Sequence, residues 1–216
     1  MSTPSGRAAE LGTEGCGFLG TREFSERAGS GVTLPVACQT RRMVACPRLE
    51  TERLVLRPFS DDDVDDYFAV LDSPEVRRWL HLPESLNRSD AWQQMAESLG
   101  QWVLRGTGQW ALEERSTGVF LGRAGLHRPE RPDWPGVEVG WTLHPDHWGR
   151  GYATEAGAEA IRYAFEELDL DRIFSCILPD NGPSQAVARR LGMELLEERT
   201  MAFFPSAPHG IWSRAR

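Results

Sequence analysis

Val137-Glu138-Val139-Gly140-Trp141-Thr142-Leu143-His144 runs directly into Pro145-Asp146-His147-Trp148-Gly149-Arg150-Gly151-Tyr152-Ala153-Thr154. The first part of this stretch alternates large apolar residues with polar or small ones, which predicts a strand. Further on, apolar residues recur at helical spacing from Ala153 to Leu168, which predicts an amphipathic helix. The glycines lie between these two elements, so the sequence predicts a strand, a glycine turn and a helix in that order.

A glycine turn at a helix N-terminus is suited to binding an anion. The first backbone N–H groups of a helix have no partner within it, and the helix dipole places about half a positive charge there. We therefore predict an anion site at this turn, with a pyrophosphate as its ligand. The alternative is a tight turn in which the glycines only permit a positive φ, and the turn alone does not decide between the two.

Two common phosphate-binding motifs fit this turn poorly. Gly149 and Gly151 match the first two glycines of the dinucleotide fingerprint, but Thr154 stands at its third position and no second βαβ repeat follows. A P-loop needs Gly-Lys-Ser or Gly-Lys-Thr, and this chain contains no lysine at all.

The turn belongs to an ordered set of motifs that resembles one enzyme family. Trp148-Gly149-Arg150-Gly151-Tyr152-Ala153 is similar to the acetyl-CoA loop Q/R-x-x-G-x-G/A of the GNAT N-acetyltransferases, with Trp148 departing from the first position. Further landmarks are Leu49 to Pro58, Glu138 to Trp141, Asn181 to Ser184 and Leu191 to Met193. From Pro47 to Met201 the chain resembles the RimJ/RimL-type branch, which includes ribosomal-protein N-terminal acetyltransferases.

The resemblance implies an architecture and an activity. The fold class is α/β (α+β): a GNAT domain over 47–216, whose central mixed, mostly antiparallel sheet of six or seven strands is flanked by about four helices. Residues 1–46 are interpreted as a disordered extension or a start-site artefact, with Met43 as the native start. The implied reaction is transfer of an acetyl group from acetyl-CoA to a primary amine, by direct attack in a ternary complex.

The resemblance also assigns roles to individual residues. Glu138 would act as the base on the acceptor amine, with His144 in reserve. The backbone N–H of Thr142 would stabilise the oxyanion, and Ser184 would protonate the leaving thiolate. Residues expected to bind acetyl-CoA are Thr142, Leu143, His144, Trp148, Gly149, Arg150, Gly151, Tyr152, Ala153, Thr154, Asn181 and Ser184.

Each assignment has a structural alternative. Glu138 could be an exposed strand carboxylate or pair with an arginine, and Asn181 and Ser184 could simply cap a helix. We interpret His127, His144 and His147 as surface or loop histidines, and Cys176, Tyr163 and the tryptophans 79, 92 and 102 mainly as packing residues. For the whole chain, the alternative is a non-catalytic acyl-CoA-binding regulatory module.

Composition restricts the class of protein. The chain has 216 residues, 40% hydrophobic and 26% charged, which favours one domain, and no apolar run or leader indicates a membrane protein or an exported one. A net charge of -8 disfavours nucleic acid and favours an amine substrate. The four cysteines show neither a disulfide framework nor zinc spacing, so we expect no metal and a cytoplasmic location.

The acceptor and the chain ends stay open at this stage. A protein N-terminus, a small polyamine and an amino acid all suit the charge, and the oligomeric state, monomer or homodimer, has no signal. The sequence ends at Arg216, soon after Ile211-Trp212, so we expect little length for the usual last strand.

Overall fold

The structure, a computed structural model, describes residues 45–216. The interpretation of residues 1–46 as an extension or artefact therefore lies almost entirely outside the described residues, as do Cys16 and Cys38. Within the described part of the chain, no helix is both long enough and apolar enough to cross a membrane.

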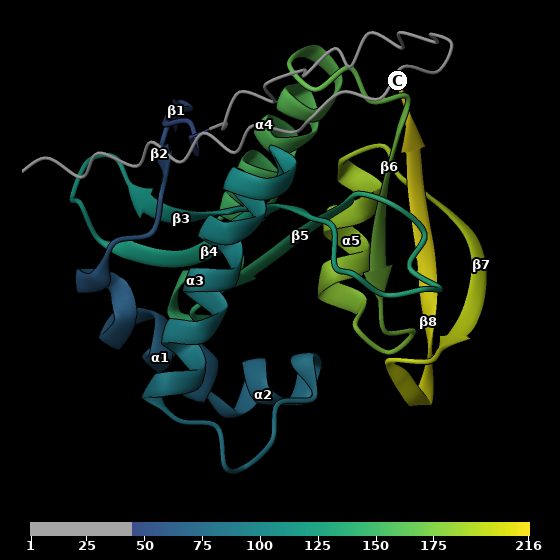
Figure 1. Ribbon diagram of the computed structural model, residues 1–216, viewed down its shortest axis with the longest axis horizontal. Helices are drawn as coiled ribbons and strands as arrows, with labels where there is room; N and C mark the ends of the chain where they lie inside the picture. The colour runs from purple at the N-terminus through teal and green to yellow at the C-terminus, as the bar shows by residue number, and fades with distance from the viewer. Residues whose placement is uncertain (1–44) are drawn as a thin grey trace, which may run out of the picture. The chain divides into compact units, whose positions relative to one another are not determined.

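The described residues form one sheet flanked by helices (Figure 1). The strands follow the order β1-β2-β3-β4-β5-β6-β8-β7, and every neighbouring pair is antiparallel except β5 and β6. The strands are β1 Leu49–Glu50, β2 Leu54–Arg57, β3 Gln109–Glu114, β4 Phe120–His127, β5 Glu138–Leu143, β6 Arg172–Ile177, β7 Glu194–Met201 and β8 Phe204–Ala215. The helices are α1 Val64–Asp72, α2 Pro74–Leu80, α3 Arg88–Arg105, α4 Tyr152–Glu166 and α5 Gly182–Arg190, with short 3₁₀ turns η1 Asp61–Asp63 and η2 Pro145–His147.

The predicted fold class is confirmed, and its strand and helix numbers need adjustment. Residues 45–216 hold eight strands and five α-helices, against the six or seven and about four expected. One extra strand, β1, has only two residues, too few to show an alternating pattern.

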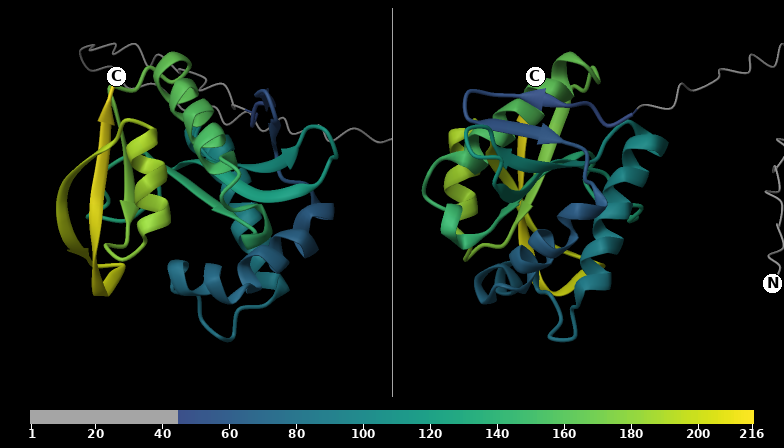
Figure 2. Two further views of the ribbon diagram at one scale, coloured as in Figure 1. Left: turned by 180° about the vertical axis from the view of Figure 1, so that it is seen from behind. Right: turned by 90° about the vertical axis from the view of Figure 1, so that its left-hand side faces the viewer.

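The expectation of a shortened last strand was wrong. β8 has twelve residues and lies between β6 and β7, pairing with both, and it forms a hairpin with β7 at the end of the sheet (Figure 2). Two prolines in its first half hide the strand pattern in the sequence, while the residues from His209 to Ser213 are all buried.

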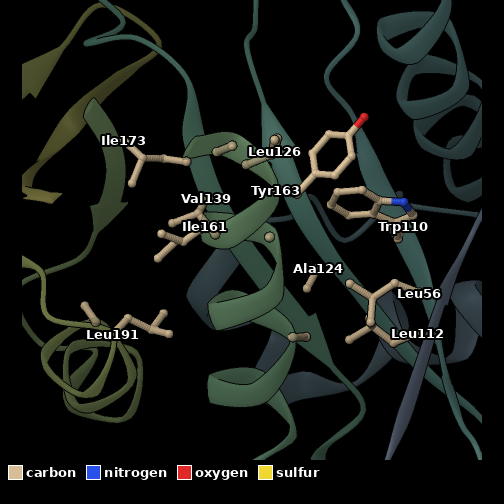
Figure 3. Packing of buried hydrophobic residues seen from close by; sticks show 14 of the residues in the cluster. Leu56, Trp110, Leu112, Ala124, Leu126, Val139, Ile161, Tyr163, Ile173 and Leu191 are labelled. Carbon is tan, nitrogen blue, oxygen red and sulfur yellow. The ribbon is translucent and has the colours of Figure 1, made fainter. Parts of the chain in front are cut away.

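Helix α4 carries the apolar stripe predicted from its spacing and covers the middle of the sheet. Ile161 projects from it toward Val139 on β5, and Tyr163 lies beside Trp110 and Leu126 on β3 and β4 (Figure 3). Leu191, just after α5, belongs to the same cluster. Burial of each such aliphatic side chain stabilises the fold by about 1.5 to 3 kcal/mol. The packing roles expected for Tyr163 and Trp102 are confirmed, because both are buried and meet edge to face at 5.9 Å.

The packing role expected for Trp92 was wrong. Its side chain is 49% exposed, and the indole N–H donates to Asp61 at 3.2 Å. Val103, eleven positions further along α3, is also exposed. At about 100° per residue these two positions share one side of the helix, next to the stripe that holds Met95 in the core.

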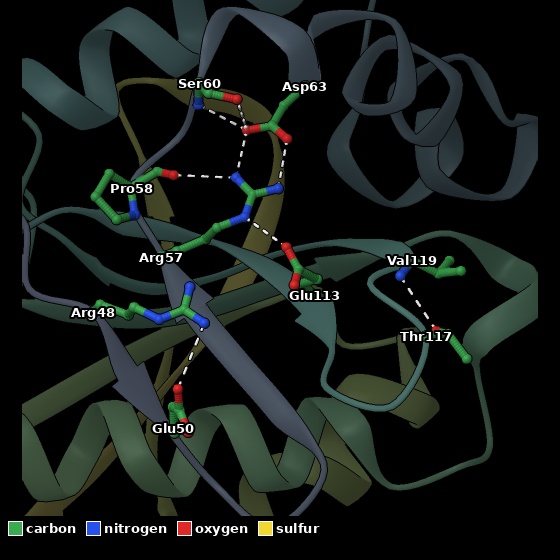
Figure 4. Close-up of polar contacts among 9 residues, drawn as sticks. All are labelled: Arg48, Glu50, Arg57, Pro58, Ser60, Asp63, Glu113, Thr117 and Val119. Carbon is green, nitrogen blue, oxygen red and sulfur yellow. Dashed lines mark hydrogen bonds and ion pairs between the residues drawn. The ribbon is translucent and has the colours of Figure 1, made fainter.

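A buried ion pair fixes the entry into the first helices. Arg57 at the end of β2 donates to both carboxylate oxygens of Asp63 at 2.7 Å and, through Nε, to Glu113 on β3 at 2.8 Å (Figure 4). Asp63 also accepts from the backbone N–H of Ser60 at 2.7 Å, which completes a capping box. Burial alone would raise the pKa of Asp63, but the hydrogen bonds from Arg57 and Ser60 hold that pKa below its ordinary value.

We predict that Asp63→Asn lowers the free energy of unfolding at pH 7 by about 2 kcal/mol, because Arg57 loses a buried charged partner. Chemical denaturation measures the change. The pKa of Asp63 is lower in the folded protein than its unfolded-state value near 4, so its ionised carboxylate stabilises the fold above that pH. As pH falls below about 4 this stabilisation is lost, and the difference in free energy of unfolding between wild type and Asp63→Asn should shrink. Asp65→Asn, which breaks the exposed pair with Arg88, is the matched control and should change little. Equal effects of the two variants would contradict the account.

Candidate active site

Strands β5 and β6 separate shortly after they meet. Their parallel ladder is registered at one pair, Glu138 with Phe174, where the Phe174 N–H donates to the Val137 carbonyl at 3.0 Å. Two residues further along β6, the N–H of Cys176 donates at 3.1 Å to the Glu138 side chain. The carboxylate of Glu138 therefore holds the two strands together at the point where they diverge.

A cavity of about 1290 Å³ lies along this divergence. Gly140 and Thr142 on β5 line it on one side, and Cys176 and Leu178 line it on the other. Small-molecule sites usually enclose about 300 to 1,000 Å³, so this cavity has room for two substrates at once. Cys176 faces the cavity, and its expected role in core packing was therefore wrong.

The glycine turn forms one wall of the same cavity. Gly149 and Gly151 have φ of +74° and +83°, a region that side chains other than glycine rarely adopt. Gly151 is the N-cap of α4 and has no side chain to cap it, so the N–H groups of the first turn stay available to a ligand. A group with negative charge fits this wall.

Arg53 holds the turn in place, and sequence analysis did not find this contact. Its guanidinium donates to the Arg150 carbonyl at 2.9 Å and to Glu155 in the first turn of α4 at 2.7 Å. The carboxylate of Glu155 also accepts from Thr51 at 2.6 Å. Thr51 and Arg53 lie in the first landmark of the sequence, and the ion pair of Arg53 with Glu155 neutralises an acidic residue beside the glycine turn.

Asn181 and Ser184 start α5 at the far wall of the cavity. Asn181 is buried, and its side-chain oxygen accepts from the Ser184 N–H at 3.1 Å. Asn181 therefore caps α5, which was the structural alternative for these two residues, and both of them also line the cavity. Capping therefore presents them to a ligand.

His127 lies between two carboxylates, so its interpretation as a surface histidine was wrong. It pairs across strands with Glu138, and its ring nitrogens lie 3.9 Å from Glu138 and 3.7 Å from Glu97 on α3. Burial by itself lowers the pKa of His127, but the contacts with Glu138 and Glu97 outweigh it and raise that pKa above its ordinary value. The β4–β5 register that creates this pairing has no local sequence signal.

The predicted site residues divide into two groups. The cavity is lined by Glu138, Thr142, Leu143, Trp148, Gly149, Gly151, Tyr152, Ala153, Thr154, Asn181 and Ser184. His144 and Arg150 are not part of this lining: the ring of His144 accepts from the Asp146 N–H at the start of η2, and Arg150 is exposed. His147 does line the cavity, and its buried Nδ1 lacks a hydrogen-bond partner among the described residues.

Comparison with known proteins agrees with this geometry. The profile of the acetyltransferase (GNAT) domain matches residues 53–194. The chain belongs to the GNAT family of acetyltransferases. It is similar to the uncharacterized N-acetyltransferase YoaA of Bacillus subtilis, 32% identical over 150 residues that span 68% of this chain and 83% of that protein.

Solved structures of this family have the same fold. An acetyltransferase from Agrobacterium tumefaciens superposes with a TM-score of 0.68 at 32% identity, over 79% of this chain and 95% of that one. RimL, a ribosomal L7/L12 alpha-N-protein acetyltransferase solved in complex with coenzyme A, superposes with a TM-score of 0.62 at 17% identity, over 79% and 97%. At that identity the second match shows the fold alone.

We predict that Gly151→Val weakens the binding of coenzyme A at least tenfold, about 1.4 kcal/mol. A side chain at this φ is strained, and its Cβ would approach the Arg53 guanidinium at 3.3 Å. Isothermal titration calorimetry gives the dissociation constant. Gly118→Val is the matched control, because Gly118 also has a positive φ of +73° but no neighbour within 4 Å. An unchanged dissociation constant in folded Gly151→Val would count against the site.

Proposed function

We propose that this acetyltransferase transfers an acetyl group from acetyl-CoA to the nitrogen of a primary amine, by direct attack in a ternary complex. One observation carries the proposal: the glycine turn and the Glu138 carboxylate line the same cavity between two separating strands. The turn suits a phosphate-bearing cosubstrate, and the carboxylate suits a cationic acceptor.

The chain's own groups would hold acetyl-CoA along the cleft. The free N–H groups from Tyr152 to Thr154 bind the pyrophosphate, and Asn181 at the opposite wall binds the pantetheine arm. When bound, acetyl-CoA supplies a thioester whose carbonyl carbon accepts a nucleophile. The exposed β5 edge beyond Glu138 is free to pair with an extended ligand because β6 has turned away.

Glu138 takes a proton from the acceptor ammonium, directly or through water. An amine is protonated near neutral pH and must lose a proton before it can attack a carbonyl. Glu138 uses one oxygen to bind the Cys176 N–H, and its other oxygen faces His127. When its ring is neutral, His127 can accept the proton that Glu138 has received, and Glu97 on the other side of the ring then stabilises the positive charge.

Thr142 and Ser184 act on the thioester itself. The backbone N–H of Thr142 donates to the carbonyl oxygen as negative charge develops there. The Ser184 hydroxyl, presented by the first turn of α5, gives a proton to the leaving thiolate.

Direct attack is favoured over an acyl-enzyme. Cys176 is the thiol that lines the cleft, and burial, followed by the negative charge of Glu138, raises its pKa far above the ordinary thiol value. A nucleophilic cysteine needs the thiolate, and this environment disfavours it.

The first test is a broad acceptor screen with acetyl-CoA. Free thiol is measured as coenzyme A is released, and mass analysis identifies the acetylated product. We expect release of thiol to depend on a primary amine and the product to gain one acetyl group. Binding of coenzyme A without turnover on any amine would contradict catalysis and indicate a regulatory module.

We predict that Glu138→Gln lowers turnover by roughly 10² to 10⁴ near neutral pH. Glutamine can still accept from the Cys176 N–H, so the strands should stay in place and the affinity for coenzyme A should not change. The loss should shrink as pH rises, since more of the acceptor is then neutral. Steady-state kinetics against pH measure this, with Glu166→Gln on the exposed face of α4 as the control. Unaltered turnover and pH profile in a folded Glu138→Gln would remove Glu138 from the mechanism.

We also predict that Glu138→Gln lowers the pKa of His127. The negative charges of Glu138 and Glu97 both stabilise the protonated His127 ring. When one of them is removed, the ring loses its proton at a lower pH. The ring proton resonances followed by NMR against pH give the value directly. Glu166→Gln should leave the His127 pKa where it is. A His127 pKa that does not move in Glu138→Gln would show that the two side chains are not coupled.

A further inference from the structure

Two guanidinium groups in the cavity make no hydrogen bond or ion pair with a carboxylate among residues 45–216. Arg123 on β4 and Arg131 in the loop after it both line the cavity and are half-buried. Among residues 45–216 neither side chain makes a hydrogen bond or an ion pair, and the Nε of Arg123 is fully buried. A buried charged donor without a partner is costly, so these groups are prepared for a ligand.

Other arginines of the described chain do not share this situation. Arg53 and Arg57 are held by carboxylates. Arg128, Arg150 and Arg190 also lack side-chain partners among residues 45–216, but they are exposed and water solvates them. Partial burial in the cavity without a hydrogen bond or ion pair therefore distinguishes Arg123 and Arg131, whose contacts are with aromatic rings, including Tyr67 at 5.6 Å from Arg123.

Both groups lie away from the wall expected to bind phosphate. Arg123 is the cross-strand partner of Thr142, beside the position of the thioester. Arg131 stacks on aromatic rings, with its guanidinium carbon 3.3 Å from the Phe203 ring centre and 4.8 Å from that of Trp134. A stacked guanidinium is held in one orientation and keeps its in-plane N–H groups free for a carboxylate.

The half of the cavity that contains Arg123 and Arg131, which we call the acceptor half, also contains acidic side chains. Glu97 and Glu138 flank His127, and their negative charges act on Arg131 across the cavity. This half therefore offers a carboxylate to an ammonium and guanidinium groups to an anion. A ligand that carries both charges would satisfy both.

The walls around this half limit the size of the acceptor. The loop after β4 is tied to the β7–β8 turn by a hydrogen bond from the Ala202 N–H to Asp133 at 2.5 Å. His81, at the end of α2, meets the Phe204 ring at 6.5 Å, and Phe204 stacks on His209 at 4.4 Å. Segments from three parts of the chain thus converge here, which suits a small molecule better than an extended peptide.

We propose that the acceptor is a free amino acid, whose carboxylate is bound by Arg131 and Arg123 while its ammonium group faces Glu138. This identity rests on the proposed function and adds a recognition site to it. In the reaction the amine nitrogen forms a bond to the acetyl carbon and the C–S bond breaks. Of the two protons the ammonium loses, one restores the thiol of coenzyme A and the other leaves through Glu138 to solvent.

The test compares amino acids with matched amines. Each amino acid of a panel is assayed beside its decarboxylated amine and its amide, with tyrosine, tyramine and tyrosinamide as one such set. We expect kcat/KM for the preferred amino acid to exceed that for its amine and amide at least a hundredfold. Peptides with an acidic second residue form a further arm, because their side chain offers a carboxylate near an N-terminal amine.

Variants then assign the preference to the arginines. Arg131→Gln and Arg123→Gln should each lower kcat/KM for the amino acid at least tenfold, mainly through KM, and should lower kcat/KM for the matched amine much less. Tryptophan fluorescence follows amino-acid binding without turnover and should show the same loss. Arg88→Gln, at an exposed position outside the cavity, is the control and should behave like wild type.

Several results would overturn the inference. Amines acetylated as fast as their amino acids, or acidic peptides preferred over free amino acids, would exclude a free amino acid as the acceptor. Equal losses on amino acid and amine in the two variants would exclude a carboxylate contact. These results differ from failure of the proposed function, in which no acceptor of any kind is acetylated.

Discussion

The separation of β5 from β6 is the constraint on which the site depends. Two neighbouring parallel strands normally bond along their whole length, and here the ladder is registered at the pair of Glu138 and Phe174. The next donor, Cys176 N–H, bonds to the Glu138 side chain, so one residue both ends the pairing and places a carboxylate at the end of the opened cleft.

The rest of the fold supports this opening from both sides. The core under α4 fixes β5, and the hairpin of β7 and β8 fixes β6 through the long last strand. Arg53 ties the segment before β2 to the N-terminal turn of α4, so the glycine turn has a fixed position relative to the sheet. Both walls of the cleft are therefore anchored in the core of the fold.

Local signals in the sequence predicted much of this arrangement. The spacing of apolar residues identified β5 and α4, and Gly149 and Gly151 identified the turn between them, because periodicity and positive φ are properties of neighbouring residues. The partners of Arg53 and His127 could not be predicted in this way. Each depends on contacts between segments far apart in the chain, and β8 was underestimated because its prolines mask a strand that tertiary pairing stabilises.

The central claim is that coenzyme A binds in the cleft between the separating strands. Titration of ¹⁵N-labelled protein with coenzyme A, followed by amide chemical shifts, tests it most directly. The account predicts that the largest shifts occur at Thr142, at residues 149–154 and at residues 181–184, with little change in β1 and β2. Shifts concentrated away from β5, α4 and α5, or none at saturating ligand, would contradict it.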